Sequence, residues 1–124
     1  MIAVTERPTS QTLVSTRVLR ELSEQMGPEI CHQFVGNYIE MWDGRFSRLV
    51  AAVDTSDFPD AMDVVLSIKI SSEMAGAQRL AGLATRAQEM VRSADRCGLA
   101  SLIEPIQQCG DDTVRHLSQT YPAR

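Results

Sequence analysis

Several features that define large classes of protein are scarce or absent in this 124-residue chain. Aromatic residues make up only 5% of it, so the core must be built mainly from aliphatic and methionine side chains, as is usual in helical bundles. Its three cysteines, Cys31, Cys97 and Cys109, are odd in number and have no CxxC spacing. This pattern predicts reduced thiols in place of a disulfide framework or a zinc site.

Positive charge is also scarce. Lysine and arginine total 12 against 16 acidic residues, which gives a net charge of −4. Binding of nucleic acid without sequence preference needs clustered Lys and Arg, so this function class is excluded. No apolar run approaches the roughly 18 residues that a membrane span needs, and the first residues lack the pattern of a secretory signal. We therefore expect a cytoplasmic protein.

Apolar residues return every three or four positions along most of the chain, which predicts an all-α protein. Helices are expected over residues 10–25, 28–53, 78–94 and 99–119. Another helix is expected between the second and third of these ranges, with Asp57 as its cap and its end near Ala75. Residues 1–8 are expected to be a flexible leader, 9–120 a single helical bundle, and 121–124 a tail. Thr9 or Ser10 is expected to cap the first helix.

The long second helix is expected to anchor the core. Its predicted buried stripe includes Ile30, Met41, Trp42 and Phe46, which recur at helical spacing. In the last helix, Gly110 costs roughly 1 kcal/mol relative to alanine, so a kink or break is expected near it.

The stretch 66–77 carries the most specific signal. It resembles the signature of the histidine-containing phosphotransfer (Hpt) domain, roughly His-x-Leu-Lys-Gly-Ser-(Ser/Ala)-x-x-Leu-Gly-Ala. In one ungapped register Ile68 replaces the leucine conservatively, and five residues match: Lys69, Ser71, Ser72, Gly76 and Ala77. The resemblance implies an antiparallel four-helix bundle of Hpt type, here with an additional N-terminal helix. It also implies a place in a bacterial two-component phosphorelay.

Two departures from that signature matter more than the matches. Leu66 stands where the family has its phospho-accepting histidine, and Ile70 stands where it has a glycine. A leucine side chain has no nucleophilic atom to accept a phosphoryl group. The resemblance therefore implies a degenerate, non-catalytic member that is not an enzyme and needs no cofactor. Its expected partner is a response-regulator receiver domain or another signalling protein.

An apolar ridge on the third helix is the candidate contact surface. Met62, Leu66 and Ile70 are spaced by four residues and so form this ridge, with Lys69 and Glu73 beside it. In the Hpt register the ridge faces solvent, and these five residues are the predicted partner-binding residues. The alternative is that the three apolar residues belong to the core.

Two further functions stay open from the sequence. In the first, the chain is a structural bundle that forms a homodimer through the same ridge. In the second, it is an active phosphotransfer protein that uses His32 or His116. Neither histidine occupies the signature position, and neither has a second ligand at metal-binding spacing, so no metal is expected. Ser67, Ser71 and Ser72 lack the context of a catalytic serine, and we expect them to serve in helix packing.

Overall fold

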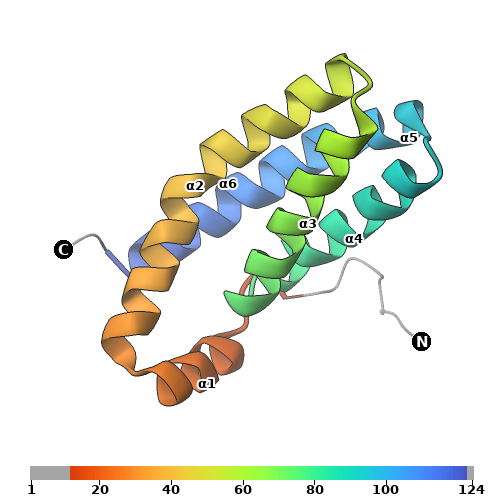
Figure 1. Ribbon diagram of the computed structural model, residues 1–124. Helices are drawn as coiled ribbons and strands as arrows, with labels where there is room; N and C mark the ends of the chain where they lie inside the picture. Colours follow the sequence, from red (N-terminus) through yellow and green to blue (C-terminus); the bar gives the residue numbers. More distant parts are fainter. Residues whose placement is uncertain (1–11, 123–124) are drawn as a thin grey trace, which may run out of the picture.

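Six helices joined by short turns make up residues 12–122, the part of the chain that the computed structural model describes. They are α1 (Thr16–Met26), α2 (Pro28–Asp54), α3 (Phe58–Met74), α4 (Gln78–Arg92), α5 (Arg96–Ser101) and α6 (Ile103–Thr120). Long helices α2, α3, α4 and α6 form an antiparallel bundle, and α1 lies across one end of it (Figure 1). Short α5 links α4 to α6 at the opposite end. The predicted all-α four-helix bundle with an extra N-terminal helix is confirmed.

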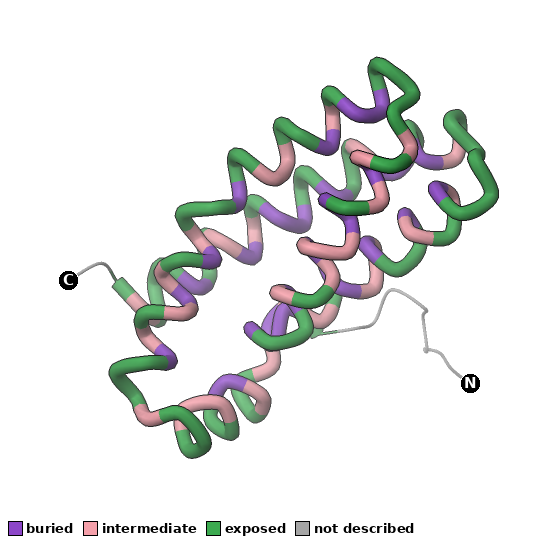
Figure 2. Tube along the Cα trace, in the orientation of Figure 1, coloured by how far each residue is buried: buried purple, intermediate pink, exposed green. Residues whose placement is uncertain are grey.

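The position of α3 in the bundle leaves one of its faces open to solvent. It packs against α2 on one side and against α4 on the other, while α6 closes the bundle between the same two helices. Helices α3 and α6 therefore occupy one diagonal of the bundle. The buried stripes of the four helices face the common interior, and the exposed stripes face outward (Figure 2).

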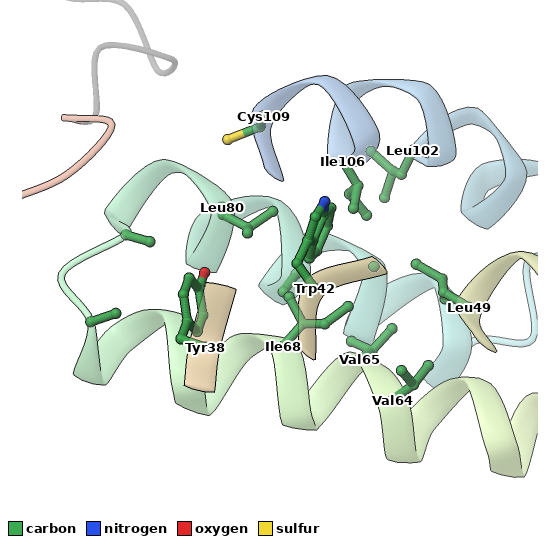
Figure 3. Close-up of a cluster of buried hydrophobic side chains, with 14 of the residues drawn as sticks. Tyr38, Trp42, Leu49, Val64, Val65, Ile68, Leu80, Leu102, Ile106 and Cys109 are labelled. Atoms are coloured by element: carbon green, nitrogen blue, oxygen red, sulfur yellow. The ribbon is translucent and has the colours of Figure 1, made fainter. Parts of the chain in front are cut away.

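Aliphatic side chains from every helix fill the interior, as the shortage of aromatics predicts. One tryptophan, Trp42, and one tyrosine, Tyr38, enter the core from α2 and lie among these aliphatic residues (Figure 3). The prediction for Trp42 is confirmed, since the residue is 4% exposed. Phe46 packs against the core but is only half-buried. All three cysteines are unpaired thiols, and Cys31 and Cys109 are buried.

Two residues of the predicted α2 stripe are not in the core. Ile30 is 48% exposed and Met41 is 50% exposed, so their expected burial was wrong. At about 100° per residue, each lies roughly 100° or more around α2 from the Trp42 direction. That angle takes both side chains past the edge of the buried stripe.

The start of α1 also differs from the prediction. The expected caps Thr9 and Ser10 lie outside the described residues, and the helix begins at Thr16, where the Ser15 hydroxyl accepts a hydrogen bond from the Val18 amide. The Ser15 amide donates to the Gly76 carbonyl at 2.7 Å. This bond holds the chain before Thr16 against the turn between α3 and α4, so the helix cannot extend backward through it.

Gly76 ends α3, as predicted, in a conformation that favours glycine. Its φ is +75°, and a Cβ at this residue would lie 2.8 Å from the Ser15 carbonyl oxygen. The start of α2 at Pro28, after Gly27, and the Asp57 cap also fall where the expected helix ranges place them. Asp57 caps α3 by accepting a hydrogen bond from the Asp60 amide at 3.1 Å.

The break expected near Gly110 is wrong. Gly110 lies inside α6, and the interruption falls earlier, at Leu102 between α5 and α6. Gly110 is needed there because the Trp42 ring lies where its Cβ would be. Close approach of an aromatic ring, and not a turn, is therefore the reason for this glycine.

Candidate functional site

The apolar ridge lies on the outer face of α3. Relative to the buried Ile68, about 100° per residue places Leu66 and Ile70 roughly 160° away in opposite directions, almost opposite the core. Ile70 is 55% exposed, and Leu66 is half-buried. Met62, nearer to α4, is half-buried and packs against the core. The structure brings the three predicted residues into one row, and the alternative that this row is core fails for Ile70.

Sequence reasoning missed one residue of the same row. Met74 continues the four-residue spacing beyond Ile70 and is 41% exposed at the end of α3. Each step of four residues turns about 40° around the helix, so the row slants across the outer face from the α4 side toward α2. Adding one more step to the predicted ridge would have found this methionine.

Polar groups line the α4 side of the ridge. Lys69 Nζ donates to Gln88 Oε1 at 3.1 Å, so its ammonium is held against α4. Glu73 is exposed one turn later and borders a shallow hollow of about 430 Å³ between α3 and α4. Small residues Ala81 and Gly82 contribute to the wall of this hollow. Lys69 and Glu73 thus place one positive and one negative charge beside the ridge.

Arginines line the α2 side. Arg45 Nη1 donates to Ser71 Oγ at 3.2 Å, and Arg48 Nη2 pairs with Asp63 Oδ2 at 2.6 Å. Arg48 also binds Asp60, and these hydrogen bonds hold the pKa of the Asp60 carboxyl below its ordinary value. Arg45 was not predicted as part of the site. Its contact with Ser71 depends on the packing of α2 against α3, which local periodicity does not report.

Two of the three serines, Ser71 and Ser72, make hydrogen bonds within the bundle. Ser71 Oγ donates to the Ser67 carbonyl at 2.7 Å, one turn back along the helix. Buried Ser72 shares a 2.6 Å hydrogen bond with the Tyr38 hydroxyl. Burial of Tyr38 raises its pKa to about 12, so this phenol is neutral at physiological pH.

Both histidines lie on other helices. His32 lies near the start of α2, where its Nε2 lies 2.9 Å from the Pro122 carbonyl oxygen and its ring contacts Tyr121 edge-on. His116 is exposed on α6, the helix diagonal to α3. Between residues 12 and 122, no cluster of three or more His, Cys, Asp or Glu side chains could hold a metal ion. No helix in this part of the chain is long and apolar enough to cross a membrane.

The residue at the middle of the outer face of α3 is aliphatic. Leu66 offers carbon atoms alone at the position where the family resemblance expects an imidazole. Side chains in a helix lean toward its N-terminus, so the branched Ile70 side chain leans over the Leu66 position one turn earlier. We therefore expect Ile70 to crowd a nucleophile placed at residue 66.

Comparison with known proteins identifies the fold. It is the fold of a histidine-containing phosphotransfer protein. The crystal structure of histidine-containing phosphotransfer protein B (HptB) from Pseudomonas aeruginosa PAO1 matches this chain with a TM-score of 0.83 and 24% sequence identity. The match covers 90% of this chain and 96% of that one. A scan against protein-family models and a search of curated proteins give no match. The predicted Hpt-type bundle is thereby confirmed.

Proposed function

We propose that this chain is a non-catalytic Hpt-like adaptor in a bacterial two-component phosphorelay. In this proposal it works in the cytoplasm and binds a receiver domain, or a signalling protein of similar shape, through the face around Leu66. The observation that carries the proposal is the position of Leu66: an aliphatic side chain faces outward on α3 in a bundle with the Hpt fold.

Surface composition supports binding at this face. Ile70 is the most exposed large apolar side chain among the described residues, and Leu66 and Met74 extend the apolar area along α3. Contiguous exposed apolar surface of this kind marks interaction sites. Burying one such side chain fully against a partner contributes roughly 1.5–3 kcal/mol. Lys69 beside them gives a partner carboxylate an orienting contact more than affinity.

Loss of catalysis in this proposal follows from the same positions. The residue at the acceptor position has no lone pair for attack on phosphorus, and the two histidines lie on α2 and α6. No cofactor or metal is required, because the proposed activity is association alone.

The proposal is tested with a panel of purified receiver domains from the genome that encodes the chain. Each receiver, with and without phosphorylation, is titrated against the wild-type chain and against Leu66→Asp by biolayer interferometry. We expect at least one receiver to bind, and Leu66→Asp to weaken that binding at least tenfold with little change in helicity or Tm. The matched control is Met26→Asp, which places the same charge on an exposed apolar residue of α1.

Three results would count against the proposal. If no receiver binds the wild-type chain, the receiver-adaptor function fails. If Met26→Asp and Leu66→Asp weaken binding equally, the contact is not at the α3 face. Unfolding of Leu66→Asp would instead make Leu66 a core residue, contrary to its outward position.

A further inference from the structure

The charges beside the ridge are of opposite sign and lie on the same side of it. From Ile68, about 100° per residue places Lys69 and Glu73 roughly 100° and 140° around α3, both toward α4. One helical turn separates them, and Glu73 is exposed. A partner with a uniformly acidic surface would be attracted by Lys69 and repelled by Glu73. The edge therefore fits a partner that places a negative group opposite Lys69 and a positive group opposite Glu73.

A second copy of this chain offers that reversed order. Consider a two-fold axis that lies in the contact plane and runs across α3. It reverses the direction of the helix but keeps the α4 side of one copy beside the α4 side of the other. Lys69 of each copy then faces Glu73 of the other, which gives two identical ion pairs. Ile70, between these two positions, packs near the axis against Ile70 of the second copy.

The shape of the face also suits pairing with itself. An isologous interface needs protruding and recessed parts within the same patch, because the patch must be complementary to itself. Here the exposed Ile70 stands on the ridge, and Glu73 beside the ridge borders the hollow lined by Ala81 and Gly82. Rows of residues at four-residue spacing are also the ridges that interlock in the commonest class of helix–helix packing.

The hydrogen bonds already made at the α4 edge of the ridge permit an ion pair between Lys69 of one copy and Glu73 of the other. Lys69 Nζ uses one of its three donor positions on Gln88 Oε1, which leaves donors for a carboxylate. Arg45, on the opposite edge, is held by Ser71 and lies away from the proposed Lys69–Glu73 contact.

We propose that the α3 face pairs with a second copy of this chain as an antiparallel, two-fold symmetric homodimer. The dimer covers the ridge with Ile70 at its centre and both Lys69–Glu73 pairs along its α4 edge. A receiver-like partner would have to compete with the second copy for the same surface. The inference concerns the chain alone and stands whether or not a receiver binds.

Sedimentation equilibrium of the full 124-residue chain, at concentrations from micromolar to several hundred micromolar, tests the proposal. We expect a reversible monomer–dimer equilibrium for the wild-type chain. Ile70→Asp removes two central contacts at once by symmetry, so it should weaken association by on the order of a hundredfold or more. Ile30→Asp is the matched control, because Ile30 is similarly exposed on α2, and its dimer affinity should equal that of wild type.

A charge exchange tests the predicted orientation. Lys69→Glu and Glu73→Lys should each weaken the dimer by roughly tenfold, since each replaces two attractive pairs with two repulsive ones. The double variant Lys69→Glu/Glu73→Lys should restore it, because the opposite charges face each other again. A monomeric wild-type chain at the highest concentration, equal effects of Ile70→Asp and Ile30→Asp, or no restoration by the exchange would each overturn the proposal. Circular dichroism of each variant shows that the bundle is intact.

Discussion

Replacement of Gly110 by alanine should destabilise the protein, although alanine is the better helix former. Gly110 lies inside α6, where the exchange by itself would contribute about 1 kcal/mol of stability. A Cβ at this residue would overlap three carbon atoms of the Trp42 ring, Cε2, Cζ2 and Cη2. The ring cannot move aside easily, because it is 4% exposed and its Nε1 donates to Asp111 Oδ1 at 3.0 Å.

Overpacking of a rigid core group costs up to about 3 kcal/mol and occasionally more. Set against the helix gain of about 1 kcal/mol, the net loss for Gly110→Ala should be roughly 2 kcal/mol. The matched control is Gly44→Ala in α2, where no atom lies within 4 Å of an added Cβ. That variant should gain about 0.5–1 kcal/mol, so the two glycines should give changes of opposite sign.

Urea denaturation measures both effects, with far-UV circular dichroism for the helices and fluorescence of Trp42, the single tryptophan, for the core. The emission spectrum of Gly110→Ala should also change, because the indole must shift. A Gly110→Ala variant as stable as Gly44→Ala would refute the reasoning. It would mean that α6 lies farther from α2 at this level than the structure shows.

The remaining predictions concern phosphoryl transfer and pH. Incubation with a phosphorylated receiver should leave the wild-type chain unlabelled, and stoichiometric phosphohistidine on it would contradict the proposed adaptor function. Leu66→His alone should restore little transfer because Ile70 leans over the site, whereas Leu66→His with Ile70→Gly should restore more; equal transfer would rule out the crowding argument. Burial raises the pKa of Tyr38 from 10.0 to about 12, so the unfolded chain loses this proton first as the pH rises. The contribution of Tyr38 should therefore be complete below about pH 10 and fall by roughly 2–3 kcal/mol between about pH 10 and pH 12. Tyr38→Phe should remove that slope, and parallel stability curves for the two proteins would show that Tyr38 ionises as easily in the folded state.

Local signals in the sequence determined most of the secondary structure. Residues that act within one turn set several helix boundaries. Gly27 with Pro28 separates α1 from α2, the Asp57 cap begins α3, and Gly76 at positive φ follows its end. Such signals depend on backbone sterics and short hydrogen bonds, which do not need the rest of the fold. The outward position of Leu66 was equally accessible, because the helical repeat places it opposite Ile68.

Only the tertiary structure decided the features that depend on a neighbouring helix. Gly110 was expected to break its helix, yet it lies inside α6. It must lack a side chain there, because the ring of Trp42 on α2, 68 positions earlier in the chain, occupies the place of a Cβ. Likewise, α1 begins at Thr16 because the Ser15 amide binds the Gly76 carbonyl. Periodicity reports which side of a helix is apolar and not how wide a stripe the neighbouring helices cover, so Ile30 and Met41, which lie past the edge of that stripe, were assigned to the core in error.

The same division applies to the candidate site. The sequence determined the residues of the ridge, Leu66 and Ile70 among them, because all of them lie on one helix with a known repeat. Packing of α3 between α2 and α4 decided what surrounds the ridge: the Lys69–Gln88 bond, the Arg45–Ser71 bond and the hollow beside Glu73. Each of these joins residues from two helices, so it exists only once the helices are packed, and it determines which charges a partner or a second copy would meet.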